Sequence, residues 1–145
     1  MLDPANPVVA LILQANGAEV ARDAVRQRAL LREARDAAST PFERAVAAHY
    51  VARIQATPAG AHHWHRDALD HARQAPPEAA RDLLPSLLLA FAESLERVGS
   101  LDRAAATYAE AVEAATALGE EGEGYARAAR EGIRRVGGLC EAPMP

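Results

Sequence analysis

The chain has 145 residues and a formal net charge of −4, and all 16 of its Lys and Arg positions are arginine. An acidic chain without a basic block lacks the row of cations that neutralises nucleic-acid phosphates, so we expect no nucleic-acid partner. Hydrophobic residues make up 50% of the chain but aromatic residues only 4%. Alanine, the best helix former, fills about a quarter of all positions, which excludes an all-β or a disordered chain.

Proline-containing pairs mark the beginnings of three predicted helices. Asn6-Pro7, Thr40-Pro41 and Thr57-Pro58 each place a side-chain acceptor at the N-cap and a proline at the first helical position. Proline has no N–H to lose there, and its fixed φ suits the helix. Glu43 stands three residues after Thr40, so we expect a capping box at this start.

Glycines and one proline shape the later helices. Gly99 and Gly119 can adopt the left-handed conformation that closes a helix, and Pro85 is expected to kink the helix that contains it. No glycine or proline marks the break near Arg22 and Asp23. The pattern predicts seven helices, followed by a flexible tail over 139–145 that contains the only cysteine, Cys140. The helices are 7–20, 24–38, 41–55, 59–74, 78–98, 101–118 and 123–136.

A repeated pattern links these helices. In the pair 78–98 and 101–118, small residues, large residues and a turn glycine follow the spacing of the tetratricopeptide repeat. These positions are Leu88, Phe91, Ala92, Leu95, Gly99, Ala104, Tyr108 and Ala111. The same spacing matches two earlier helix pairs less well. Helix 123–136, with Tyr125, Ala129 and Ile133 on one face, is expected to cap the stack. We expect an all-α, right-handed solenoid of about three degenerate tetratricopeptide-like hairpins plus a C-terminal capping helix, forming one domain over 1–138.

Residues 47–55, 64–69 and 85–87, together with the third repeat, carry a family resemblance. In these segments the chain resembles a family of small bacterial tetratricopeptide-repeat proteins of about this length. Members are often labelled ribosomal-RNA adenine methyltransferase. That activity requires a strand and a glycine-rich turn to hold S-adenosylmethionine, and the sequence has neither, so we expect no methyltransferase. The leading expectation is a protein that is not an enzyme and holds no cofactor.

In tetratricopeptide stacks, the first helix of each pair lines a concave groove that takes a peptide or a helix. The repeat positions that face this groove carry apolar side chains, one aromatic ring, one arginine and several carboxylates. The predicted groove residues are Asn16, Glu19, Tyr50, Arg53, Leu89, Glu93 and Glu96. This groove favours a partner with basic or amide-rich side chains and a carboxylate for Arg53. The alternative is that Glu93 and Glu96 face solvent and Arg53 makes an internal ion pair.

Histidines gather around Trp64, the only tryptophan. His49 and His65 fall at close-contact positions of the repeat, where one interpretation is a buried, hydrogen-bonded imidazole pair. The other is a pocket for a small molecule, or an active site, built from His49, Tyr50, Trp64 and His65, because buried histidine and tyrosine can transfer protons.

Zinc-type ligands also share one helical stripe, His63, Asp67 and His71. Eight residues of helix span about 12 Å, which is too far for one ion with bonds of about 2 Å. We therefore expect no metal site.

Three functions remain open at this point. The leading one is a scaffold or adaptor that binds a protein or peptide in the groove, and the second is the small-molecule pocket. The third is self-association as a homodimer through the first helix, with Val8, Val9, Leu11 and Ile12 pairing across a two-fold axis. The lone cysteine, the absence of a basic leader and the absence of an apolar run of about 20 residues favour a cytoplasmic protein without a membrane partner.

Overall fold

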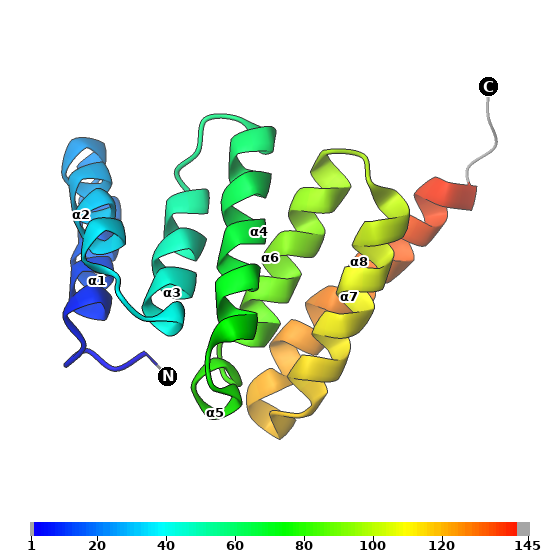
Figure 1. Ribbon diagram of the computed structural model, residues 1–145. Coiled ribbons are helices and arrows are strands. Elements are labelled where there is room, and N and C mark those ends of the chain that lie inside the picture. The colour runs from blue at the N-terminus through cyan, green and yellow to red at the C-terminus, as the bar shows by residue number, and fades with distance from the viewer. Residues whose placement is uncertain (1, 142–145) are drawn as a thin grey trace. The chain divides into compact units, whose positions relative to one another are not determined.

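Two compact units make up the chain, residues 1–77 and residues 78–145. The computed structural model describes residues 2–141, and all regular structure in that range is helical (Figure 1). The predicted all-α class is therefore confirmed, while the single domain and the right-handed tetratricopeptide-like solenoid stay predictions. No helix in the described range is both long and apolar enough to span a bilayer.

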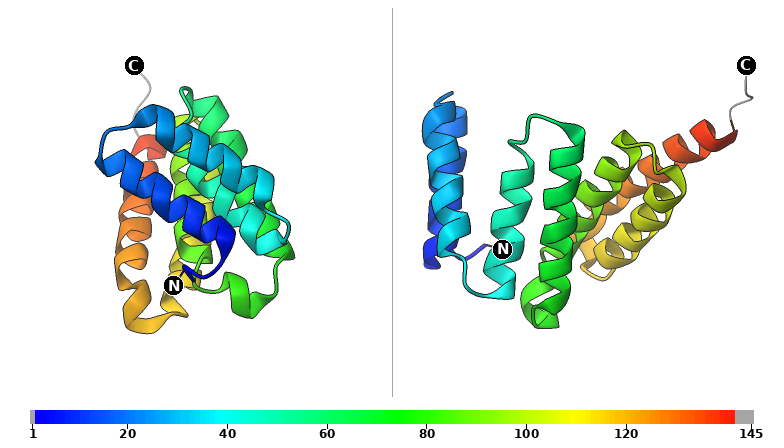
Figure 2. Two further views of the ribbon diagram at one scale, coloured as in Figure 1. Left: turned by 90° about the vertical axis from the view of Figure 1, so that its left-hand side faces the viewer. Right: turned by 45° about the horizontal axis from the view of Figure 1, so that its top comes forward.

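Helical hairpins form the first unit. One hairpin pairs α1 with α2 and the next pairs α3 with α4 (Figure 1, Figure 2). The hairpins stack, because α3 also contacts both α1 and α2. The bounds are α1, Pro7–Val20; α2, Ala24–Ala37; α3, Pro41–Ala52; and α4, Pro58–Gln74.

The predicted helix starts of this unit are correct. The Asn6 side chain accepts two backbone N–H bonds at the start of α1, and the Thr57 hydroxyl accepts one at the start of α4. Thr40 and Glu43 form the capping box at the start of α3. These bonds satisfy backbone donors that have no partner inside the helix.

The break between α1 and α2 is also confirmed, and it needs no glycine. The backbone N–H of Asp23 donates to the carbonyl of Ala18 at 2.9 Å and that of Arg22 to Glu19 at 3.0 Å, the two bonds of a Schellman ending. Arg22 itself adopts the left-handed conformation, with φ of 58°. The Asp23 carboxylate then caps α2 by accepting from the backbone N–H of Arg26.

The second unit contains three longer helices. Helix α7 contacts both α6 and α8, and α6 also contacts α8 (Figure 1). A short helix, α5, precedes them and a 3₁₀ turn, η1, joins α7 to α8. The bounds are α5, Pro77–Ala80; α6, Leu84–Arg97; α7, Leu101–Thr116; η1, Gly119–Gly122; and α8, Glu123–Glu141.

The single kinked helix predicted over 78–98 is wrong. The chain leaves the helix after Ala80 and begins a new one at Leu84, with Pro85 in its first turn. Proline lacks the N–H for an intrahelical bond and its ring clashes with the carbonyl four residues earlier, so a helix interior is its worst position. A fresh helix start accommodates Pro85 without either cost.

Two predicted helix ends also need correction. Helix α3 ends at Ala52 rather than at residue 55, because the N–H groups of Arg53, Ile54 and Gln55 bond carbonyls three residues back and tighten the last turn. Helix α8 continues to Glu141, so residues 139–141 of the predicted tail are helical, whereas 142–145 lie outside the described residues. Neither Gly137 nor Gly138 has the positive φ that would end the helix.

The third predicted repeat has its apolar positions buried. Gly99 closes α6 with φ of 84°. The side chains that the template places at the α6–α7 contact are all nearly inaccessible, and they are Leu88, Phe91, Ala92, Leu95, Ala104, Tyr108 and Ala111.

The face of α8 that packs inward differs in part from the predicted one. Ala129 is buried as predicted, but Tyr125 is 37% exposed and Ile133 only half-buried, and the other buried side chains of α8 are Ala126 and Val136. Glycine is required at position 132, because a Cβ there would lie 2.5 Å from the Tyr108 ring. The aromatic ring of α7 thus fixes how closely α8 approaches.

Candidate functional site

A continuous row of polar and aromatic side chains crosses α1, α3 and α4, and we call it the Glu19–His65 row. Arg53 places Nη2 3.7 Å from Oε2 of Glu19 on α1 and its guanidinium carbon 5.4 Å from the centre of the Tyr50 ring. Tyr50 meets His49 edge to face, with ring centres 5.3 Å apart. The His49 ring centre lies 5.7 Å from that of His65 on α4. The row joins residues predicted for the groove to residues predicted for the pocket.

The Glu19 end of this row is open to solvent. The side chains of Arg53 and Glu19 are 48% and 49% exposed, and Tyr50 is partly exposed. The internal ion pair considered for Arg53 therefore exists, but an exposed pair of this kind contributes only about 0–1 kcal/mol. Both charges can exchange this contact for a partner at little cost.

The histidine end of the row is less open, and His49 and His65 are both half-buried. Burial, with the positive charges of His65 and Arg53 adding to it, lowers the pKa of His49 from 6.5 to about 4. Nδ1 of His49 is buried and has no hydrogen-bond partner among the described residues. His49 is therefore neutral at pH 7, and its pKa lies far from the range that suits a general acid or base near that pH.

Trp64 lies in a separate cavity of the first unit. A cavity of about 210 Å³ is lined by α2, α3, α4 and the first residue of the α2–α3 connection. The guanidinium carbon of Arg35 lies 5.8 Å from the indole centre. None of His49, Tyr50 and His65 lines this cavity, so the structure brings those three together and places Trp64 elsewhere. The lining residues are Arg35, Ala38, Arg44, Ala47, Ala48, Trp64, Asp67 and His71.

Arg35 and Arg44 both line this cavity beside the indole of Trp64, and the sequence analysis named neither as a site residue. They come from different helices, so only the packing of α2 against α3 brings them together. Asp67 and His71 also line the cavity, with Oδ2 and Nε2 3.5 Å apart. His63, the third residue of the supposed zinc stripe, packs against Trp64 instead. Within the described residues, no three His, Cys, Asp or Glu side chains gather as a metal site.

Glu96, a predicted groove residue of the second unit, has internal partners. Arg135 on α8 donates from Nε and Nη2 to the two carboxylate oxygens at 2.6 and 2.9 Å. The Tyr108 hydroxyl donates to Oε2 at 2.7 Å. The hydrogen bonds from Arg135 are the largest cause of a lowered pKa for Glu96. Glu96 thus ties α6 to α7 and α8.

The other predicted groove residues of α6 are less constrained. Leu89 is half-buried and Glu93 is exposed, although desolvation still raises the pKa of the Glu93 carboxyl. Asn16 of α1 is half-buried, one turn before Glu19.

The apolar side chains proposed for self-association are already covered. Val8, Val9 and Ile12 are at most 2% exposed, and only Leu11 of the four reaches solvent in part. They form the core of the first unit instead of an open face. A homodimer would have to use other residues, and none is indicated by the described residues.

No family model, curated protein or solved structure matches this chain. The resemblance to small bacterial tetratricopeptide-repeat proteins therefore stays a prediction that rests on the residues quoted for it.

Proposed function

We propose that the protein is a binding module, a helical-hairpin scaffold that takes a peptide segment of a protein partner on the face formed by α1 and α3. The observation that carries the proposal is the open end of the Glu19–His65 row. There, the first helices of two successive hairpins present a carboxylate, a guanidinium and a tyrosine ring side by side. Stacked helical hairpins commonly bind partners on such a surface.

The chemistry of the partner follows from these three side chains. Tyrosine and arginine are the residues that most often dominate binding energy at protein interfaces. A carboxylate of the partner would replace Glu19 on Arg53, and a basic or amide side chain would then pair with Glu19. Asn16, one turn along α1, adds an amide that can bond a peptide backbone.

Selection from a displayed library of random peptides tests this function. Peptides enriched on the wild type should carry an acidic residue close to a basic or amide residue. Arg53→Glu should weaken their binding roughly tenfold or more, because a charge-assisted contact is replaced by repulsion. Arg103→Gln, an exposed arginine of the second unit, serves as the control and should bind like the wild type.

A charge exchange separates recognition from structure. The double variant Glu19→Arg/Arg53→Glu restores the ion pair between α1 and α3 with the two charges interchanged. If these residues contact the partner directly, the double variant stays folded but still fails to bind the selected peptides. Full recovery of binding would mean that the pair only holds the two helices together, and the proposal would be abandoned.

A second candidate function is the binding of a small anion at Trp64, favoured by the convergence of Arg35 and Arg44 on one cavity. Its 210 Å³ is below the roughly 300–1,000 Å³ of common ligand pockets, so the ligand would be a small carboxylic acid. Titration with acetate, benzoate and phosphate should change the fluorescence of the only tryptophan. Arg44→Gln should abolish that change, and a flat response to all three anions would remove this candidate.

A further inference from the structure

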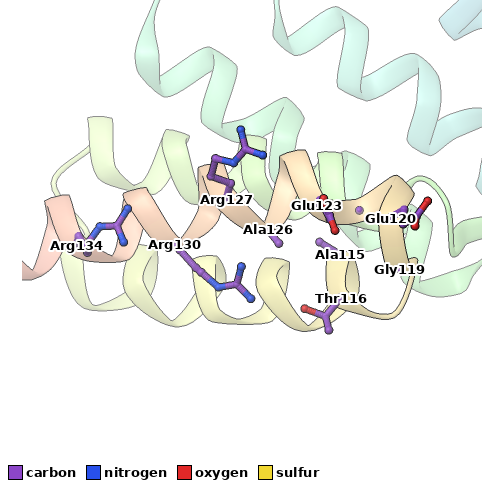
Figure 3. A pocket seen from close by; sticks show the side chains of 10 residues that line it. Ala115, Thr116, Gly119, Glu120, Glu123, Ala126, Arg127, Arg130 and Arg134 are labelled. Carbon is purple, nitrogen blue, oxygen red and sulfur yellow. The ribbon is translucent and has the colours of Figure 1, made fainter.

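One cavity of the second unit lies where α7, η1 and α8 meet. It measures about 610 Å³, within the roughly 300–1,000 Å³ typical of small-molecule sites. Figure 3 shows Arg127, Arg130 and Arg134 extending from α8, with Glu120 and Glu123 at the opposite end of the cavity. This cavity takes no part in the peptide-binding face proposed for α1 and α3.

The three arginines are available for a ligand. They stand three and four residues apart and span about 10 Å of α8, and Figure 3 shows the Arg127 and Arg130 side chains extending in different directions along the cavity. All three are exposed, and none makes a hydrogen bond or ion pair with the residues that the structure describes. Arg135, their neighbour on the same helix, is by contrast held by both oxygens of Glu96.

The opposite end of the cavity has the reverse charge. Glu120 and Glu123 line it, and neither forms an ion pair with a described residue. Gly122 lets the η1 turn close this end, because a Cβ there would clash with the carbonyl oxygen of Ala115 on α7. A ligand in this cavity therefore meets guanidinium groups at one end and hydrogen-bond-accepting carboxylates at the other.

We propose that this cavity binds a small phosphorylated molecule whose other end carries hydroxyl or amino groups. A phosphoryl group brings up to two charges and three acceptor oxygens, which suits several guanidinium forks, whereas a carboxylate can occupy one. The hydroxyl or amino end donates to Glu120 and Glu123. A long acidic peptide fits less well, because it would bring further carboxylates against those same two side chains.

Calorimetric titration with ribose 5-phosphate, ribose, inorganic phosphate and a glutamate octapeptide tests the site. Ribose 5-phosphate should bind more tightly than inorganic phosphate, and ribose alone should not bind detectably. Arg130→Gln should weaken ribose 5-phosphate roughly tenfold, as expected for one charge-assisted contact. The triple variant Arg127→Gln/Arg130→Gln/Arg134→Gln should abolish binding.

Matched variants keep the test specific. Arg26→Gln/Arg66→Gln/Arg103→Gln removes the same charge from exposed positions that do not line the cavity and should leave the affinity within about twofold, since exposed charges are screened by salt. Glu120→Gln/Glu123→Gln should make ribose 5-phosphate no better a ligand than inorganic phosphate. Circular dichroism checks that every variant keeps its helices.

Three results would overturn the proposal. The first is absence of binding of ribose 5-phosphate to the wild type at millimolar concentration. The second is equal binding by the wild type and the triple variant. The third is preference for the glutamate octapeptide over ribose 5-phosphate, which would make the arginines a docking surface for an acidic protein segment.

Discussion

Replacing His49 with glutamine should remove a loss of stability that the wild type suffers in acid. The pKa of His49 is lowered from 6.5 to about 4, mainly by burial. Between these two values the unfolded chain binds a proton that the folded chain refuses, so acid favours unfolding. The contribution of His49 is fully present above the unfolded pKa of 6.5 and is lost as the pH falls toward 4.

The size of this effect follows from the two pKa values. One unit of pKa difference is worth about 1.36 kcal/mol, so lowering the pH from about 7.5 to about 4.5 should reduce the free energy of unfolding by about 2.5 kcal/mol through His49 alone. Glu43 and Glu96, whose pKa values are lowered in the folded chain, add a loss of the same sign. Only the difference between variant and wild type isolates the histidine.

Urea unfolding followed by Trp64 fluorescence measures this difference, because Trp64 is the only tryptophan and lies on α4 of the same unit. The wild type should lose about 2.5 kcal/mol more than His49→Gln over this pH range. His63→Gln, at an exposed position next to Trp64, should behave like the wild type. Parallel pH profiles for the wild type and His49→Gln would refute the reasoning.

Five further substitutions test helix packing and helix ends within each unit. Gly132→Ala should lower the free energy of unfolding by about 1–3 kcal/mol, because its Cβ would lie 2.5 Å from the Tyr108 ring. Gly137→Ala, whose Cβ would meet open space, should raise the free energy of unfolding by about 0.5–1 kcal/mol. Urea unfolding should therefore show changes of opposite sign for the two variants. Arg22→Gly should raise the free energy of unfolding by about 1 kcal/mol, because glycine adopts the left-handed backbone conformation without strain. Gly99→Ala should lower the free energy of unfolding by a similar amount. A change of the same sign for both variants in urea unfolding would contradict this account. Tyr108→Phe should cost about 1–2 kcal/mol by removing the bond to Glu96, so an unchanged melting temperature would show that this bond is not stabilising.

Local signals in the sequence were sufficient for most of the helices. A cap such as Thr40 with Glu43, or a turn glycine such as Gly99, acts within four residues, so its effect can be predicted without tertiary structure. Pro85 was misjudged because the same residue is compatible with a kink or with a new start, and the surrounding leucines decide between them only through packing. The face of α8 was misjudged because the close approach of Gly132 to Tyr108 is a long-range contact.

The candidate sites required the tertiary structure more than the helices did. Tyr50 and Arg53 were predicted as binding residues from their repeat positions, but their contact with Glu19 depends on the stacking of α1 on α3. Trp64 was grouped with His49 and His65 because they are close in sequence or in the repeat, yet neighbouring helical residues point to different sides. The arginines of α8 passed unnoticed because three exposed cations resemble an ordinary solvated face until η1 closes the cavity beside them.

Affinity capture from a lysate of the source cells, read by mass spectrometry, tests the central claim most directly. Wild type, the Tyr50→Ala/Arg53→Glu double variant and the Arg103→Gln control would be compared at equal concentration, after circular dichroism has verified their helices. The binding-module account predicts a protein that is captured by the wild type and by Arg103→Gln but not by the double variant. Equal capture of every protein by all three forms would contradict it.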